Sequence, residues 1–170
     1  MTSSESLKLD RFPMRRGGGA FLACVGVAII ASAFDAPNVQ RDLAIGAALG
    51  IILLVLVIRL QRRHGGARAT PLQIGLLFAA IAIEFIVFWK LYPLVPPDQR
   101  LRVYVALGIV AGHFLLMAWS FGPMIVYLAL ALLVWLAATY WALPEIGLNV
   151  VIGGDGGLKL LFGLAMLMIG

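Results

Sequence analysis

Four ionisable side chains lie inside long apolar stretches of this 170-residue sequence: Glu84, His113, Asp155 and Lys159. A charged side chain near the middle of a lipid bilayer costs on the order of 2.5 to 3.5 kcal/mol by insertion scales. Residues of this kind in membrane helices commonly pair with one another and mark proton relays, ion pathways or ligand sites. We therefore take these four residues as the candidates for a proton, ion or ligand site.

The positions of three of these residues along their apolar runs predict a common depth. Glu84 precedes the aromatic end of its run at Tyr92 by eight residues, and His113 follows the start of the next run at Val103 by ten. At about 1.5 Å per helical residue, they lie about 12 and 15 Å from the same membrane face. Asp155 follows Pro144, at the start of the last run, by eleven residues, which places it about 16 Å from that face by the same rise. The sequence therefore predicts that Glu84 and His113 meet on consecutive antiparallel helices.

Lys159 follows Asp155 by four residues, the spacing at which opposite charges pair along one helix face. We expect Lys159 to be the partner of Asp155 rather than a catalytic amine. A structural interpretation of all four residues stays open beside the functional one. Polar contacts between membrane helices contribute about 0.6 kcal/mol on average, so such pairs can persist without any chemistry.

The elements that must position these residues are membrane-spanning helices. The sequence is 62% hydrophobic and 12% charged, whereas soluble domains are about half apolar and a quarter charged. A span takes about 20 residues, so six spans take about 120 and leave no room for a soluble domain. We predict an all-α polytopic helix bundle, with a cytoplasmic tail over residues 1–19 and a single transmembrane domain over 20–170. The expected spans lie near residues 20–34, 43–60, 74–92, 103–121, 124–143 and 146–170.

Two of these six spans leave alternatives open. The first is short, follows Arg15 and Arg16, and ends in Ala-Ser-Ala, a pattern also typical of a cleavable signal peptide. We expect it to be retained as a span. The last contains Gly-Gly-Asp-Gly-Gly over residues 153–157, which predicts a helix broken near mid-membrane. Cleavage of the first run, or a re-entrant last run, would give five spans.

Small and aromatic residues predict how the helices pack and where they end. Gly46 and Gly50 have the GxxxG spacing that places both on one helix face, and we expect close helix packing there. The pair at residues 108 and 112 has the same spacing, and we expect the same role for it. Trp89 and Tyr92 lie near the end of their run and are expected to be anchors at the membrane interface.

Basic residues predict the orientation and the partner. The net charge of +5 would favour nucleic acid in a soluble protein, but here the basic residues flank apolar runs. We therefore expect anionic lipid headgroups as the partner, and no nucleic acid. A cytoplasmic N-terminus places eight basic residues inside and four outside, which predicts that both termini are cytoplasmic. The arginines expected to contact lipid headgroups are Arg59, Arg62, Arg63 and Arg68.

The residue inventory argues against enzymes and bound cofactors. The H-E-x-x-H pattern of zinc proteases is absent, and Cys24 is the single cysteine. A haem with two histidine ligands would need a second histidine inside the membrane, whereas His64 lies in a predicted loop. We expect no enzymatic activity, no metal site and no cofactor.

Three stretches in the C-terminal third resemble a family of small multi-spanning bacterial membrane proteins of unknown function. They are GHF at residues 112–114, FGPMIVYL at 121–128 and DGGLKLLFGL at 155–164. The resemblance implies a bacterial inner-membrane location and marks His113, Asp155 and Lys159 as motif positions. It implies no activity, substrate or cofactor. Glu84 lies outside these three stretches.

Two functions from different classes follow from these patterns. The first is a small transporter or an ion- or proton-coupled permease, with Glu84, His113 and Asp155 as the coupling site. The second is a non-catalytic accessory or scaffold subunit, which would bind lipid or a larger membrane complex. The basic loop, the glycine faces and the lack of a chemical motif favour the second. A homo-oligomer or a larger complex is the expected assembly.

Overall fold

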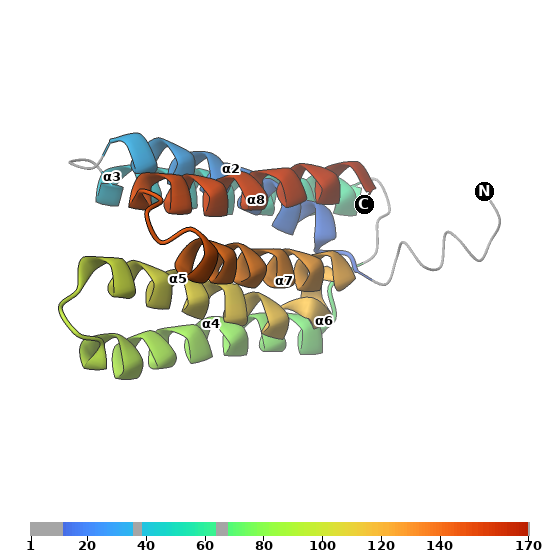
Figure 1. The fold of residues 1–170 in the computed structure, drawn as a ribbon. Coiled ribbons are helices and arrows are strands. Elements are labelled where there is room, and N and C mark those ends of the chain that lie inside the picture. Colours follow the sequence, from blue (N-terminus) through green and yellow to red (C-terminus); the bar gives the residue numbers. More distant parts are fainter. Residues whose placement is uncertain (1–11, 36–38, 64–67, 170) are drawn as a thin grey trace.

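The computed structural model describes residues 12–35, 39–63 and 68–169, and the regular structure within these residues is entirely helical (Figure 1). The all-α prediction is therefore confirmed for the described part of the chain, whereas residues 1–11 of the predicted tail lie outside it. The helices, in chain order, are α2 (Arg15–Phe34), α3 (Val39–Arg63), α4 (Pro71–Leu91), η2 (Tyr92–Leu94), α5 (Gln99–Leu116), α6 (Ala118–Phe121), α7 (Pro123–Ala137), η3 (Ala138–Ala142) and α8 (Leu148–Ile169).

The long helices form two groups of three. Helix α2 lies between α3 and α8 and packs against both, while α5 lies between α4 and α7 (Figure 1). Contacts between α7 and α8 join the two groups. The shared core contains fully buried Leu128 and Leu132 from α7 and Met166 from α8. Burial of these side chains fixes how the two groups sit against each other.

Within the described residues, five helical segments are long and apolar enough to cross a membrane: Arg15–Phe34, Arg41–Gln61, Pro71–Leu94, Pro123–Ala142 and Leu148–Ile169. The sixth expected span, at 103–121, is helical but is not one of these five. It is divided between α5 and α6, and α5 begins with Gln99, Arg100 and a second arginine at 102, which lower its apolar character. The expected helices are therefore present, but the count of six spans exceeds the five qualifying segments.

The prediction that the last helix is broken is wrong. Helix α8 continues from Leu148 to Ile169 through all four glycines of residues 153–157. Each glycine lowers helix stability by about 1 kcal/mol relative to alanine, so packing must hold this segment. The indole of Trp135 covers Gly154, and its Nε1 donates a hydrogen bond of 3.0 Å to the carbonyl of Val151. Gly156 packs directly on the backbone of α2.

Glycines allow α2 and α8 to pack with their backbones in contact. They are spaced seven residues apart on both helices, Gly19 and Gly26 on α2 and Gly156 and Gly163 on α8. A Cβ atom added at any of the four would lie 2.6 to 2.8 Å from a backbone atom of the other helix. Gly19 faces Gly163 and Gly26 faces Gly156, so the two helices are antiparallel.

The two predicted GxxxG pairs differ in their surroundings. Gly46 and Gly50 on α3 approach Ala28 and Phe21 of α2 too closely for a Cβ atom, so the predicted close packing is confirmed there. At Gly108 and Gly112 no such packing occurs within the described residues, because an added Cβ would have none of their atoms within 4 Å. The buried side of α5 instead carries Tyr104, Ala111 and Phe114.

Candidate functional site

The structure places Glu84 of α4 against His113 of α5. The histidine Nδ1 lies 2.7 Å from the carboxylate Oε2, and the two side chains are 9% and 22% exposed, histidine first. The approach lacks the alignment of a hydrogen bond, and neither ring nitrogen has a hydrogen-bond partner among the described residues. Buried polar groups are almost always satisfied in folded proteins. The imidazole therefore retains unused hydrogen-bonding capacity next to a carboxylate.

The ends of α4 and α5 set the register that brings these two residues together. Thr70 caps α4 by accepting a hydrogen bond of 3.2 Å from the backbone N–H of Gln73, and Gln73 returns a capping-box contact. Asp98 caps α5 by accepting a bond of 2.6 Å from the N–H of Leu101. The short helix η2 and the prolines after it join α4 to α5. These caps fix where each helix begins, and thereby the positions of Glu84 and His113 along the bundle.

Asp155 and Lys159 form a second pair, on consecutive turns of α8. The Lys159 ammonium donates to Asp155 Oδ2, and the two side chains are 2% and 0% exposed, lysine first. The other carboxylate oxygen, Oδ1, is buried and has no hydrogen-bond partner within the described ranges. Burying an ion pair is costly unless the remaining polar atoms are also satisfied. This pair therefore lies in the core with one acceptor left over.

One aromatic ring lies between the two pairs. Lys159 Nζ is 6.0 Å from the ring centroid of Phe114, which is stacked against the imidazole of His113 with centroids 5.5 Å apart. The negative charge of Glu84 is also within electrostatic range of Lys159. The four residues singled out in the sequence thus belong to one region of the structure, on α4, α5 and α8.

A cavity of about 380 Å³ borders the Glu84–His113 pair. Its walls come from both groups of helices and include Leu54 of α3, Ile81 of α4 and Ile125 of α7. Among the described lining residues, Glu84 and His113 are the ones with polar side chains. Ligand sites typically combine an apolar lining of about 300 to 1,000 Å³ with a few polar groups that fix orientation. The cavity matches that pattern.

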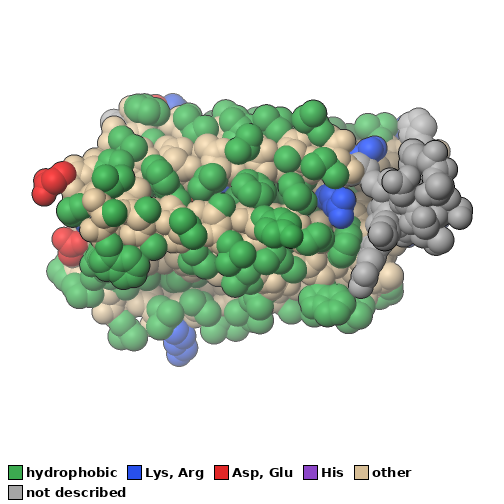
Figure 2. Space-filling model, turned by 45° about the vertical axis from the view of Figure 1, so that its right-hand side comes forward, with side chains coloured by type: hydrophobic (Ala, Val, Ile, Leu, Met, Phe, Trp, Pro, Cys, Tyr) green, Lys and Arg blue, Asp and Glu red, His purple; other side chains and the backbone are tan. Residues whose placement is uncertain are grey.

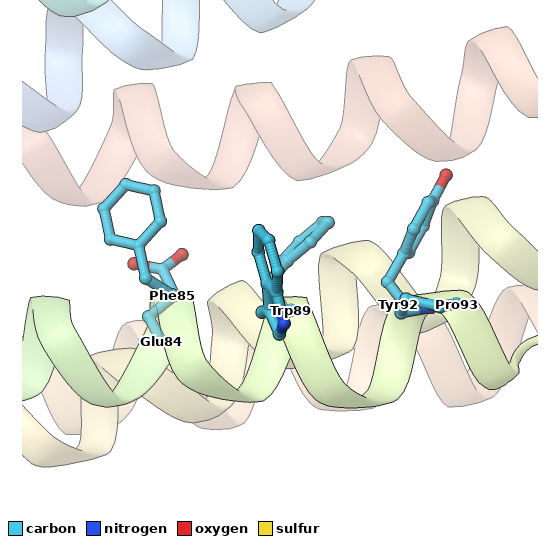
Figure 3. A pocket seen from close by; sticks show the side chains of 6 residues that line it. Glu84, Phe85, Trp89, Tyr92 and Pro93 are labelled. Carbon is cyan, nitrogen blue, oxygen red and sulfur yellow. The ribbon is translucent and has the colours of Figure 1, made fainter.

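A second hollow, of about 720 Å³, lies along α4 and is here called the aromatic groove (Figure 3). The side chains of Glu84, Phe85, Trp89 and Tyr92 extend from α4 and η2 toward the same side (Figure 3). Glu84 and Phe85 line both this groove and the 380 Å³ cavity. The described residues that line the aromatic groove are Glu84, Phe85, Phe88, Trp89, Tyr92 and Pro93.

Sequence reasoning missed the aromatic groove because Trp89 and Tyr92 were interpreted as interface anchors only. The signal that could have found it is the spacing of Phe85, Phe88, Trp89 and Tyr92, which lie one, four, five and eight residues after Glu84. That spacing places aromatic rings and a carboxylate on one helix face. In the structure Phe88 and Tyr92 are stacked, with ring centroids 5.0 Å apart.

The predicted basic cluster lies away from these pairs. Arg59 and Arg63 are exposed near the end of α3, and Arg68 is exposed just before α4. The side chain of Arg62 lies outside the described part of the structure. No group of three or more potential metal-binding side chains occurs within the described residues.

Comparison with known protein families gives a match over almost the whole chain. Residues 5–170 match a family described as a family of unknown function (DUF6609). The match extends well beyond the C-terminal third in which the resemblance was seen, and it includes Glu84. The description states neither a bacterial origin nor a membrane location. No curated protein and no solved structure matches the chain significantly.

Proposed function

We propose that this chain, which belongs to the DUF6609 family of unknown function, is a small ion- or proton-coupled membrane permease. Its polar site comprises Glu84 and His113, together with the buried Asp155–Lys159 pair of α8 on the other side of the Phe114 ring. The observation that carries the proposal is the contact between Glu84 and His113 at the edge of an apolar cavity, with both imidazole nitrogens lacking hydrogen bonds. The role is the handling of ions or ligands, without covalent catalysis and without a cofactor.

The outer surface supports a location in a membrane. In the most apolar part of α3, only 11% of the residues are buried inside the protein. In the most apolar part of α4, the buried share is only 6%. Figure 2 shows one face of the molecule covered by hydrophobic side chains, with few charged ones. Soluble monomers rarely expose apolar patches larger than a few hundred Å². Lipid is the solvent that fits this surface.

The helix arrangement supports a topology with both termini on one side. Gly19 near the start of α2 contacts Gly163 near the end of α8, so these two helix ends lie at the same end of the bundle. The prediction from basic residues makes that end cytoplasmic, in the inner membrane of a bacterium. Arg59, Arg63 and Arg68 then contact anionic headgroups there, where each can contribute about 1 kcal/mol of attraction.

The chemistry at the site follows from the two side chains in contact. A protonated imidazole next to a carboxylate is an ion pair, and transfer of the proton to the carboxylate leaves two neutral groups. Both forms have a net charge of zero, so the proton can move between the two side chains without placing a net charge inside the membrane, where charge is expensive. Glu84 is 22% exposed and His113 is 9% exposed, so the carboxylate is the group better placed to exchange a proton with an entering ion or ligand.

Proton movement through reconstituted vesicles tests this proposal. Vesicles with wild-type protein and an entrapped pH dye are given a potassium diffusion potential, and the rate of internal pH change is recorded. We expect a clear rate above protein-free vesicles, reduced by about tenfold or more in Glu84→Gln, as for loss of a proton-transfer group. Glu145→Gln is the matched control, because Glu145 is exposed in the turn before α8. Equal rates for wild type and Glu84→Gln would exclude this proton pathway.

The second candidate function, an accessory or scaffold subunit, is favoured by Gly108 and Gly112. Among the residues that the structure describes, none lies in front of this GxxxG pair on α5, so another helix could approach the backbone there. If the second function holds, a partner or a second copy should co-purify at fixed stoichiometry in mild detergent. The double change Gly108→Ile and Gly112→Ile should then remove it, whereas Gly75→Ile, at another open glycine, should not. A monodisperse monomer for the wild type and for both variants would argue against this function.

A further inference from the structure

We infer that the aromatic groove and Glu84 bind a lipophilic organic cation, meaning an amine, ammonium or phosphonium ion with large apolar substituents. This inference rests on the proposed function, because it takes Glu84 as the charged group of the same site and names the class of substrate. Three features of the described residues carry it: the arrangement of the rings, the sign of the charge and the connection to the cavity.

The arrangement of the rings fits a cation with apolar substituents. Phe85, Phe88, Trp89 and Tyr92 follow Glu84 along one face of α4 and η2. In Figure 3 the side chains of Phe85, Trp89 and Tyr92 extend toward the same side as Glu84. A cation over an aromatic face gains about 0.5 to 1 kcal/mol at exposed sites and about 2 when water is excluded. Trp89 is 78% exposed, so its indole is accessible to a ligand from outside the protein.

The sign of the charge favours a cation over an anion. Glu84 is the charged residue among the described residues that line the aromatic groove. The positive charge of Lys159 is already engaged by Asp155 in the core of α8. His113 balances Glu84 only while it is protonated, and a bound cation can take its place beside the carboxylate. An anion would meet uncompensated negative charge in this groove.

The connection to the cavity gives room for the apolar part of the ligand. Glu84 and Phe85 line both hollows, so a cation held at Glu84 can place a substituent in the 380 Å³ cavity and another along the 720 Å³ groove. Both volumes lie within the range of sites for drug-sized molecules. Because the groove is open at the apolar surface of α4, such a ligand can enter from the lipid.

Equilibrium binding of tetraphenylphosphonium to purified protein in mild detergent tests the inference. Tetraphenylborate is the matched probe, because it has the same four rings and the opposite charge. We expect saturable binding of the phosphonium with about one site per chain and about tenfold weaker binding by Glu84→Gln, as for a lost charge partner. Trp89→Leu should weaken binding about threefold, the size of one cation–π contact. Trp141→Leu changes an equally exposed indole on η3 and should leave binding unchanged.

Several outcomes would overturn the inference. They are equal affinity of wild type and Glu84→Gln, equal loss of binding in the Trp89 and Trp141 variants, and effective competition by tetraphenylborate. If Glu84→Gln fails to fold, two other variants decide the result. Glu84→Asp keeps the negative charge and should still bind the phosphonium. Trp89→Leu changes an exposed side chain and should bind it about threefold more weakly. Binding needs no transport. Binding without proton flux would therefore overturn the permease alone, and flux without binding would overturn the cation site alone.

Discussion

Replacing Gly156 with alanine is expected to destabilise the protein by about 2 kcal/mol, whereas the same change at Gly157 should be neutral or stabilising. A Cβ at Gly156 would lie 2.8 Å from the carbonyl oxygen of Gly26 and 2.9 Å from the backbone nitrogen of Ile30. Backbone atoms cannot rotate away as a flexible side chain can, so α2 and α8 must move apart. A Cβ at Gly157 would have no atom of the described part of the chain within 4 Å.

The two neighbouring glycines form a matched pair for this experiment. Both changes add one methyl group to α8, and both gain about 1 kcal/mol of helix propensity. Their difference therefore isolates the contact between α2 and α8. The measurement is thermal unfolding in mild detergent, where about 2 kcal/mol corresponds to a shift of roughly 4–8 °C for a chain of this size. The same melting temperature for both variants would show that the backbones of α2 and α8 are not in contact.

The helices could be predicted from the sequence because their apolar runs are long and bounded by charged residues, glycine and proline. Gly122 and Pro123 separate two of these runs just before α7, and Gly122 has φ of +89°, a conformation that favours glycine. The continuity of α8 could not be predicted in the same way. It depends on Trp135 and on the backbone of α2, which are distant in the sequence.

The polar pairs were predictable to different degrees. Asp155 and Lys159 follow from the four-residue spacing alone, because that spacing places both on one helix face. Contact between Glu84 and His113 needed the added assumption that their helices are antiparallel neighbours, which the proline-rich turn between them favours. The close approach of α2 to α8 was not predictable from a four-residue motif, because its glycines repeat every seven residues.

Breaking the Asp155–Lys159 pair from one side is expected to have the largest effect on stability of any single change considered. Asp155→Leu leaves the ammonium of Lys159 2% exposed and without its carboxylate, and Lys159→Met leaves the carboxylate alone. Removing one partner of a buried ion pair typically costs about 3–5 kcal/mol, because the remaining charge is neither solvated nor compensated. Each single variant should therefore melt well below the wild type.

The double variant Asp155→Leu with Lys159→Met separates a structural role from a functional one. Apolar residues of similar size often replace a buried ion pair without loss of stability, so the double variant should melt near or above the wild type. In a double-mutant cycle, the changes at the two sites will then be far from additive. A double variant that is stable but has lost proton flux would place the pair in the permease pathway. Additive destabilisation would mean that the two charges do not compensate each other, contrary to their contact on α8.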